Sequence, residues 1–103
     1  MHRAPALPLF LLALAACGAQ PTPRMFGAER FDVTRNGRDY VLYRKDNRVE
    51  VIRLGYARNG EHAGIRETMV ALIPEVTGCR LVESSLRGDS GEMRGRVICP
   101  ATP

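Results

Sequence analysis

Alternating apolar and polar positions predict three β-strands in the first half of the folded part of the chain. The three segments are residues 30–35, 38–44 and 48–54. In the first of them Phe31 and Val33 fall on the same face, because successive side chains of a strand point to opposite sides. The second segment, RDYVLYR, is rich in the aromatic and β-branched residues that favour strands.

Tight turns separate these segments. Asn36-Gly37 is the strongest short hairpin signal, because a type I′ turn needs positive φ at both of its central residues. Lys45-Asp46-Asn47 predicts a second turn. Three strands joined in this way form an antiparallel meander.

A helical spacing of apolar residues begins after Asn59-Gly60, with the helix expected to start at Glu61 or His62. The stripe consists of Ile65, Met69, Leu72, Ile73 and Val76. Gly78 can adopt the left-handed conformation that ends helices. Pro74 lacks an N–H to donate to Val70, so we expect either a kink or a tightened last turn.

Two further strands are predicted at residues 79–86 and 93–99, joined by a turn at residues 87–91. The order is therefore β-β-β-α-β-β. Because a helix with one apolar stripe must bury it, we expect an α+β fold. It would consist of an antiparallel sheet of about five strands with the helix packed on one face.

The N-terminus differs in character from the rest of the chain. Arg3 precedes an apolar run, residues 7–16, of roughly 10 residues, which is half the length needed to span a bilayer. This arrangement is typical of a secretory signal. Leu14-Ala15-Ala16-Cys17 resembles the lipobox of bacterial lipoproteins. The alternative is an ordinary secretory signal that happens to contain a cysteine.

The resemblance implies that a diacylglyceryl group is attached to the thiol of Cys17 and that a signal peptidase cuts between Ala16 and Cys17. We then expect a signal peptide at residues 1–16, a lipidated cysteine and flexible tether at 17–28, and a small α+β domain at 29–103. The protein would face the periplasm on a membrane of the cell envelope. Gly18 replaces the Asp that retains enteric lipoproteins at the inner membrane, which favours the outer one.

With Cys17 assigned to lipid, Cys79 and Cys99 remain. An even pair in an exported domain predicts a disulfide. A hairpin centred on Asp89 would place these cysteines opposite each other and Leu81 opposite Val97, all on one face. Free thiols or metal ligands are the alternatives. No second Cys or His lies at metal-ligand spacing, so neither a metal nor a cofactor is expected.

Charge adds little to this interpretation. Removal of Arg3 lowers the 15 basic residues to 14, against 11 acidic ones. The excess is too slight to predict nucleic-acid binding, although a weak attraction to anionic lipid headgroups is compatible with it. Eight basic residues gather in the meander: Arg30, Arg35, Arg38, Arg44, Lys45, Arg48, Arg53 and Arg58.

The meander is interpreted mainly as a solvated face with cross-strand ion pairs, such as Arg38 with Asp32 or Glu50 with Arg44. The functional alternative is a basic surface for membrane headgroups or an acidic partner. The tyrosines of this stretch are expected in sheet packing, with an exposed aromatic patch as the alternative. They are Tyr40, Tyr43 and Tyr56.

Candidate catalytic residues are few. His62, the histidine that remains after cleavage, lies at the predicted helix start and is interpreted as solvated. Three serines lack a motif such as G-x-S-x-G: Ser84, Ser85 and Ser90. Arg87-Gly88-Asp89 matches the integrin-binding tripeptide but is interpreted as a turn. The sequence therefore argues against an enzyme.

We accordingly expect a membrane-anchored envelope lipoprotein that acts as a non-catalytic interaction or accessory module. Its partners would be the membrane, through the lipid, and an envelope protein or anionic polymer. The alternative is a small periplasmic inhibitor or ligand-binding lipoprotein.

Overall fold

The computed structural model describes residues 20–101. They form a five-stranded antiparallel sheet with one long helix, which confirms the expected α+β class. The elements are the short 3₁₀ helix η1 (Pro23–Met25), β1 (Glu29–Arg35), β2 (Arg38–Lys45), β3 (Arg48–Arg53), α2 (His62–Thr77), β4 (Arg80–Gly88) and β5 (Glu92–Ile98).

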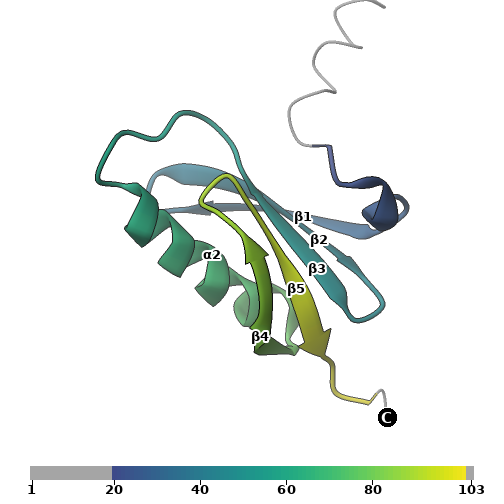
Figure 1. Ribbon diagram of the computed structural model, residues 1–103. Helices are drawn as coiled ribbons and strands as arrows, with labels where there is room; N and C mark the ends of the chain where they lie inside the picture. The colour runs from purple at the N-terminus through teal and green to yellow at the C-terminus, as the bar shows by residue number, and fades with distance from the viewer. Residues whose placement is uncertain (1–19, 102–103) are drawn as a thin grey trace, which may run out of the picture.

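In space the strands lie in the order β1-β2-β3-β5-β4. The hairpin of β4 and β5 therefore pairs with the β1–β2–β3 meander through β5, and β4 is an edge strand of the sheet. Figure 1 shows α2 lying across one face of the sheet, with η1 on the opposite side. In the part of the chain described, no helix is long and apolar enough to cross a bilayer.

The predicted turns are present. Asn36 has φ 55° and Gly37 has φ 73°, the pair of positive values that a type I′ turn requires. Asp46, in the second turn, has φ 57°. These turns set the register so that Arg35 lies opposite Arg38 and Lys45 opposite Arg48.

Helix α2 buries the predicted stripe. Ile65, Met69, Leu72 and Ile73 are all buried, while Val76 packs at the edge of the same cluster. Gly78 ends the helix with φ 73°, and its N–H donates to the carbonyl of Pro74. Pro74 thus lies inside the last turn and still provides the closing acceptor.

The sheet has a hydrophobic cluster on each face. The larger one lies under α2, where the helix stripe packs on Leu42, Val49 and Val51. The smaller one lies on the other face, where Met25 of η1 covers Val41 and Tyr43. Part of the segment expected as a tether therefore packs against the sheet, because Met25 is only 4 % exposed.

The expected disulfide is present. Cys79 and Cys99 are joined by an S–S bond of 2.04 Å across 20 residues of sequence. Leu81 pairs with Val97 as the hairpin register predicts. Both cysteines, Leu81 and Val97 belong to the cluster beneath α2, so the bond closes the open end of the last hairpin on the buried face.

The suggested cross-strand ion pairs are wrong. Asp32 lies opposite Val41, and Arg38 instead pairs with Glu61, at 3.2 Å. Glu50 lies opposite Tyr43, so alternation places its side chain on the face away from Arg44. Arg44 pairs with Glu29 at 3.7 Å. The residue types were suitable for ion pairs, but the pleat separates them onto different faces.

Candidate functional site

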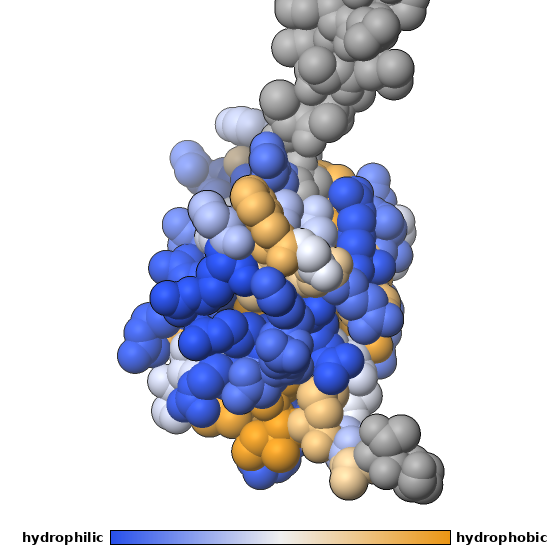
Figure 2. Space-filling model, turned by 90° about the vertical axis from the view of Figure 1, so that its right-hand side faces the viewer, coloured by the Kyte–Doolittle hydropathy of each residue, from blue (hydrophilic) through white to orange (hydrophobic). Residues whose placement is uncertain are grey.

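A groove lies on the face of the sheet turned away from α2. It has a volume of about 210 Å³ and is lined by five arginines, namely Arg24, Arg48, Arg87, Arg94 and Arg96. Figure 2 shows that hydrophilic side chains cover most of this side of the molecule. We refer to the cavity and its five arginines as the arginine groove.

Strand alternation brings the central arginines together. Arg94 and Arg96 occupy alternate positions of β5, so both point to the face opposite Met93 and Val97, which are buried under the helix. Arg48 begins β3 and lies directly opposite Arg96. Arg24 comes from η1, whose position is set by the burial of Met25.

A bulge in β4 shapes the other wall. Between the pairs Val82–Arg96 and Arg87–Arg94, residues 83–86 of β4 face the single residue Gly95 of β5. The hydroxyl of Ser85 accepts from the N–H of Arg96 at 2.8 Å and donates to the carbonyl of Val82. These bonds satisfy backbone groups that the bulge removes from the ladder of strand hydrogen bonds. The bulge also changes the face to which the later residues of β4 point, so that the side chain of Arg87 lies on the groove side of the sheet.

The register places like charges side by side. Arg48 pairs with Arg96 and Arg87 pairs with Arg94, although like charges directly opposite each other destabilise a sheet. Arg94 has one acidic partner, Glu92, at 2.6 Å, and Arg87 donates to the carbonyls of Ser84 and Leu86. Across residues 20–101, the side chains of Arg24, Arg48 and Arg96 have neither a hydrogen bond nor an ion pair.

A second like-charged pair in the same sheet is compensated. Arg35 lies opposite Arg38, but each faces an acidic residue of the helix segment. Arg35 forms a two-bond ion pair with Glu75, which lowers the pKa of that carboxyl. In the arginine groove, by contrast, only Arg94 has an acidic partner among residues 20–101, so positive charge is only partly compensated there.

The segment that carries Arg24 is fastened by a buried carboxylate. Oε1 of Glu50 accepts hydrogen bonds from the N–H of Thr22 at 3.0 Å and from its hydroxyl at 3.4 Å. The Glu50 side chain is only 1 % exposed. Thr22 lies five residues after Cys17, so this hydrogen-bonded position is close in sequence to the expected lipid site.

Glu50 also faces Glu92 of the neighbouring strand β5. Burial, together with the hydrogen bond to Glu50 and its charge, raises the pKa of Glu92 to about 7. One oxygen of Glu92, Oε2, is buried and lacks a donor among the described residues. Glu92 is therefore a carboxyl group with a raised pKa beside the groove and the docked segment.

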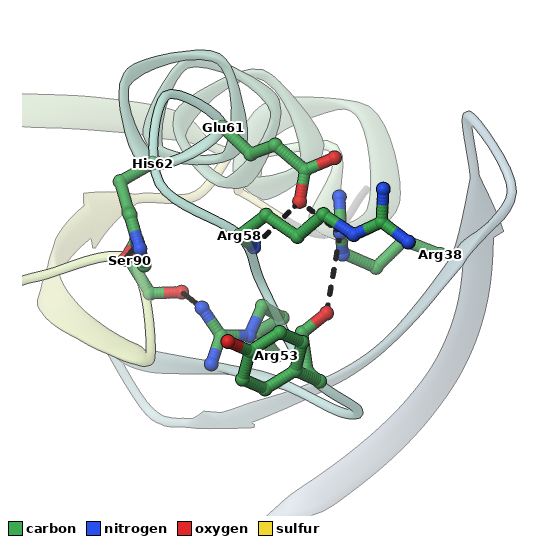
Figure 3. Close-up of polar contacts among 7 residues, drawn as sticks. Arg38, Arg53, Arg58, Glu61, His62 and Ser90 are labelled. Atoms are coloured by element: carbon green, nitrogen blue, oxygen red, sulfur yellow. Dashed lines mark hydrogen bonds and ion pairs between the residues drawn. The ribbon is translucent and has the colours of Figure 1, made fainter.

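A separate polar cluster joins the helix start to the last turn (Figure 3). Nδ1 of His62 lies 2.5 Å from the hydroxyl of Ser90, and the carbonyl of Ser90 accepts from Arg53 at 3.2 Å. The carboxylate of Glu61 accepts from the N–H of Arg58 at 2.7 Å and pairs with Arg38. The N–H of Arg58 is the main cause that lowers the pKa of Glu61.

This cluster brings together a serine and a histidine, the first two members of a nucleophilic triad. The third member is missing from the described geometry, because the carboxylate of Glu61 is directed to Arg58 and Arg38 (Figure 3). Ser90 is only 6 % exposed. The hydrogen bond between His62 and Ser90 therefore links the start of α2 to the β4–β5 turn.

The residues singled out from the sequence as candidates for lipid attachment, metal binding or aromatic contacts lie in different parts of the chain. Cys17 and Ala16 lie outside the described residues. Tyr40 and Tyr43 are buried in the sheet as expected, whereas Tyr56 is 83 % exposed. Within residues 20–101, no group of three His, Cys, Asp or Glu side chains is arranged to hold a metal.

Sequence reasoning missed most of the groove. Of its five arginines, only Arg48 belonged to the basic meander noted from sequence, and the other four come from η1, β4 and β5. One signal was available, since Arg94 and Arg96 alternate with Met93, Gly95 and Val97, which predicts that both arginines lie on one face of the strand. The bulge and the docking of η1 have no comparable signal in the sequence.

No family model, curated protein or solved structure matches this chain.

Proposed function

We propose that this chain is a lipid-anchored module of the bacterial envelope that binds a partner through the arginine groove and performs no catalysis. The arginine groove is the observation that carries this proposal. It combines five guanidinium groups with a concave surface, whereas charged side chains on a solvated sheet face normally alternate in sign or pair with one another.

The anchor is proposed from the lipobox resemblance at Leu14–Cys17, and the disulfide suits an oxidising compartment such as the periplasm. We propose that Cys17 carries the lipid and that the chain faces the periplasm, with the outer membrane favoured over the inner. The docking of Thr22 on Glu50 supports a short connection between this lipid and the groove.

A ligand-binding lipoprotein is the second candidate. The groove is a cavity and not a flat face, which favours a compact anionic ligand over a broad protein surface. Both candidate functions use the same arginines. They differ in the size of the bound molecule, which is a protein or polymer in the first and a compact anion in the second.

Expression of the full chain in a bacterium with lipoprotein processing tests the anchor. Mass spectrometry should find a mature product that begins at Cys17 and carries an acyl-bearing mass increment, with the protein in the membrane fraction. Cys17→Ala should remove both properties. The matched control, Cys79→Ala with Cys99→Ala, should keep the acylation. A mature N-terminus elsewhere, or an unmodified Cys17, would refute the anchor.

The same preparations test the partner. Crosslinking in the native envelope should capture species that depend on the groove arginines and on Cys17, and fractionation of the two membranes should place the protein. If Cys17→Ala captured the same species equally well, the partner would not depend on membrane anchorage, and this part of the proposal would be refuted.

A further inference from the structure

The arginine groove is built for a ligand of particular chemistry. A guanidinium group offers a planar fork of N–H donors that matches the oxygens of a phosphate in a two-bond geometry. Arg48 and Arg96, directly opposite each other on β3 and β5, leave such forks without an internal acceptor in the described structure. A volume of about 210 Å³ equals that of roughly seven waters, which accommodates a phosphate group.

The repulsion within the groove also needs a cause. Like charges directly opposite each other destabilise a sheet, and of the two arginine pairs of the groove only Arg87–Arg94 has an acidic neighbour, Glu92, while Arg48–Arg96 has none among the described residues. A bound anion converts this unfavourable arrangement into a favourable one. Binding sites commonly retain such locally destabilising groups, because function and stability make opposing demands.

The position of the groove relative to the proposed anchor narrows the ligand. Thr22 lines the groove and is held by Glu50. Cys17 lies five residues earlier, a stretch that spans at most about 18 Å when fully extended. With its lipid inserted in a bilayer, the groove would lie within reach of the headgroup layer, where phosphates are the most abundant anions.

We infer that the arginine groove binds the headgroup phosphate of an anionic phospholipid and so orients the domain on its membrane. This inference rests on the proposed lipid anchor. Binding would place the sheet face against the headgroups and direct α2 and the disulfide away from the bilayer. The lipid anchor supplies attachment, and the groove supplies orientation.

The test uses the full chain purified in neutral detergent micelles, followed by NMR of its backbone amide and arginine Nε–H signals. Micelles are doped with phosphatidylglycerol, with phosphatidylcholine, or with neither, and separate titrations use inorganic phosphate and polyglutamate. Phosphatidylglycerol should shift the signals of Arg48 and Arg96 at lower concentrations than any other probe. High salt should weaken the response.

Arg48→Gln with Arg96→Gln is the decisive variant. It removes a repulsive pair, so the domain should fold at least as well as the original, while binding should weaken by about tenfold or more for each guanidinium lost. The matched control is Arg58→Gln with Arg66→Gln, which removes the same charge from exposed positions outside the groove. This control should bind phosphatidylglycerol as the original does.

Several outcomes would overturn the inference. Equal responses to inorganic phosphate and to phosphatidylglycerol would exclude a lipid-specific role. A stronger response to polyglutamate would indicate an acidic protein partner. Equal loss in both double variants would indicate attraction to net charge alone. Acylation of Cys17 is measured by mass spectrometry on the same samples, so failure of the anchor is distinguished from failure of the groove.

Discussion

Thr22 and Glu50 are joined by a hydrogen bond from the N–H of Thr22 to a carboxylate oxygen, at 3.0 Å, across 28 residues of sequence. The bond fastens the segment before β1 to the third strand, on the face opposite α2. It connects the two features from which function is proposed, because Thr22 lines the arginine groove and lies five residues after Cys17.

Glu50→Ala should therefore release residues 22–25 from the sheet. Loss of a hydrogen bond to a buried charged group shifts a local opening equilibrium by about tenfold or more. The measurement is the rate of tryptic cleavage after Arg24, followed by mass spectrometry. Glu83→Ala, at an exposed position of β4, is the matched control. An unchanged cleavage rate in Glu50→Ala would show that the burial of Met25 alone holds the segment.

Glu92 should make stability depend on pH. Its folded-state pKa of about 7 lies above the ordinary value of 4.5, mainly because of burial. The folded protein therefore holds a proton that the unfolded chain has released at intermediate pH. The contribution to stability is full below about pH 4.5 and is lost as the pH rises through about 7.

Glu92→Gln should accordingly raise the free energy of unfolding at about pH 8, by on the order of 1–2 kcal/mol, and leave it nearly unchanged at about pH 4. Denaturant titrations at several pH values measure this. Glu83→Gln, exposed on β4, should show no such difference between the two pH values. If Glu92→Gln were destabilising at high pH, the ionised carboxylate would be needed by Arg94.

The disulfide should account for a large share of the stability of this small domain. Cys79→Ala with Cys99→Ala should lower the free energy of unfolding by about 3 kcal/mol, because the bond constrains a loop of 20 residues in the unfolded chain. Denaturant unfolding with and without reductant measures the effect. Reductant should destabilise the original and leave the double variant unchanged; equal sensitivity would contradict the assignment.

Two glycines should respond to alanine in opposite directions. Gly88 has φ +114°, and an added Cβ would overlap the backbone oxygen of Glu92 and lie 2.9 Å from Cα of Met93. Gly88→Ala should cost about 2 kcal/mol or more. Gly64 lies in α2 with no atom near its Cβ position, so Gly64→Ala should stabilise by about 0.5–1 kcal/mol. Thermal unfolding compares the two, and the same sign for both would contradict the geometry.

Ser90 should behave as a structural residue. Ser90→Ala should lower the free energy of unfolding by about 1 kcal/mol, through loss of the bond to His62. A fluorophosphonate probe should not label the folded protein, because Ser90 is buried and His62 has no orienting carboxylate among residues 20–101. Labelling at Ser90 that disappears in Ser90→Ala would instead establish a nucleophile and refute the non-catalytic proposal.

The secondary structure of this chain was predictable because its determinants are local. Alternation from Phe31 to Val51, the positive φ of Asn36-Gly37 and the helical spacing from Ile65 to Ile73 each act over a few residues. The disulfide followed from the same logic, since a turn centred near Asp89 places Cys79 opposite Cys99. The far end of that hairpin followed the expected register, and only the part near the turn departed from it.

The candidate site was largely beyond sequence reasoning. Ion pairs chosen by residue type, such as Arg38 with Asp32, failed because the pleat places those side chains on opposite faces. Glu50 was expected among solvated charges, yet docking of Thr22 and Met25 buries it. Such contacts join segments far apart in sequence, and no local preference anticipates them.

The amino-acid sequence thus determined the strands, the helix, the turns and the cysteine pairing, because backbone preferences and the periods of strand and helix operate within each segment. Tertiary structure alone decided that β5 lies between β3 and β4, that β4 bulges at residues 83–86, and that η1 folds back onto the sheet. These three decisions gather Arg24, Arg48, Arg87, Arg94 and Arg96 around one groove. The physical reason is that the charge of each side chain follows from its residue type, which the sequence gives directly. Which charges lie close together depends on long-range packing, and burial of apolar surface drives that packing.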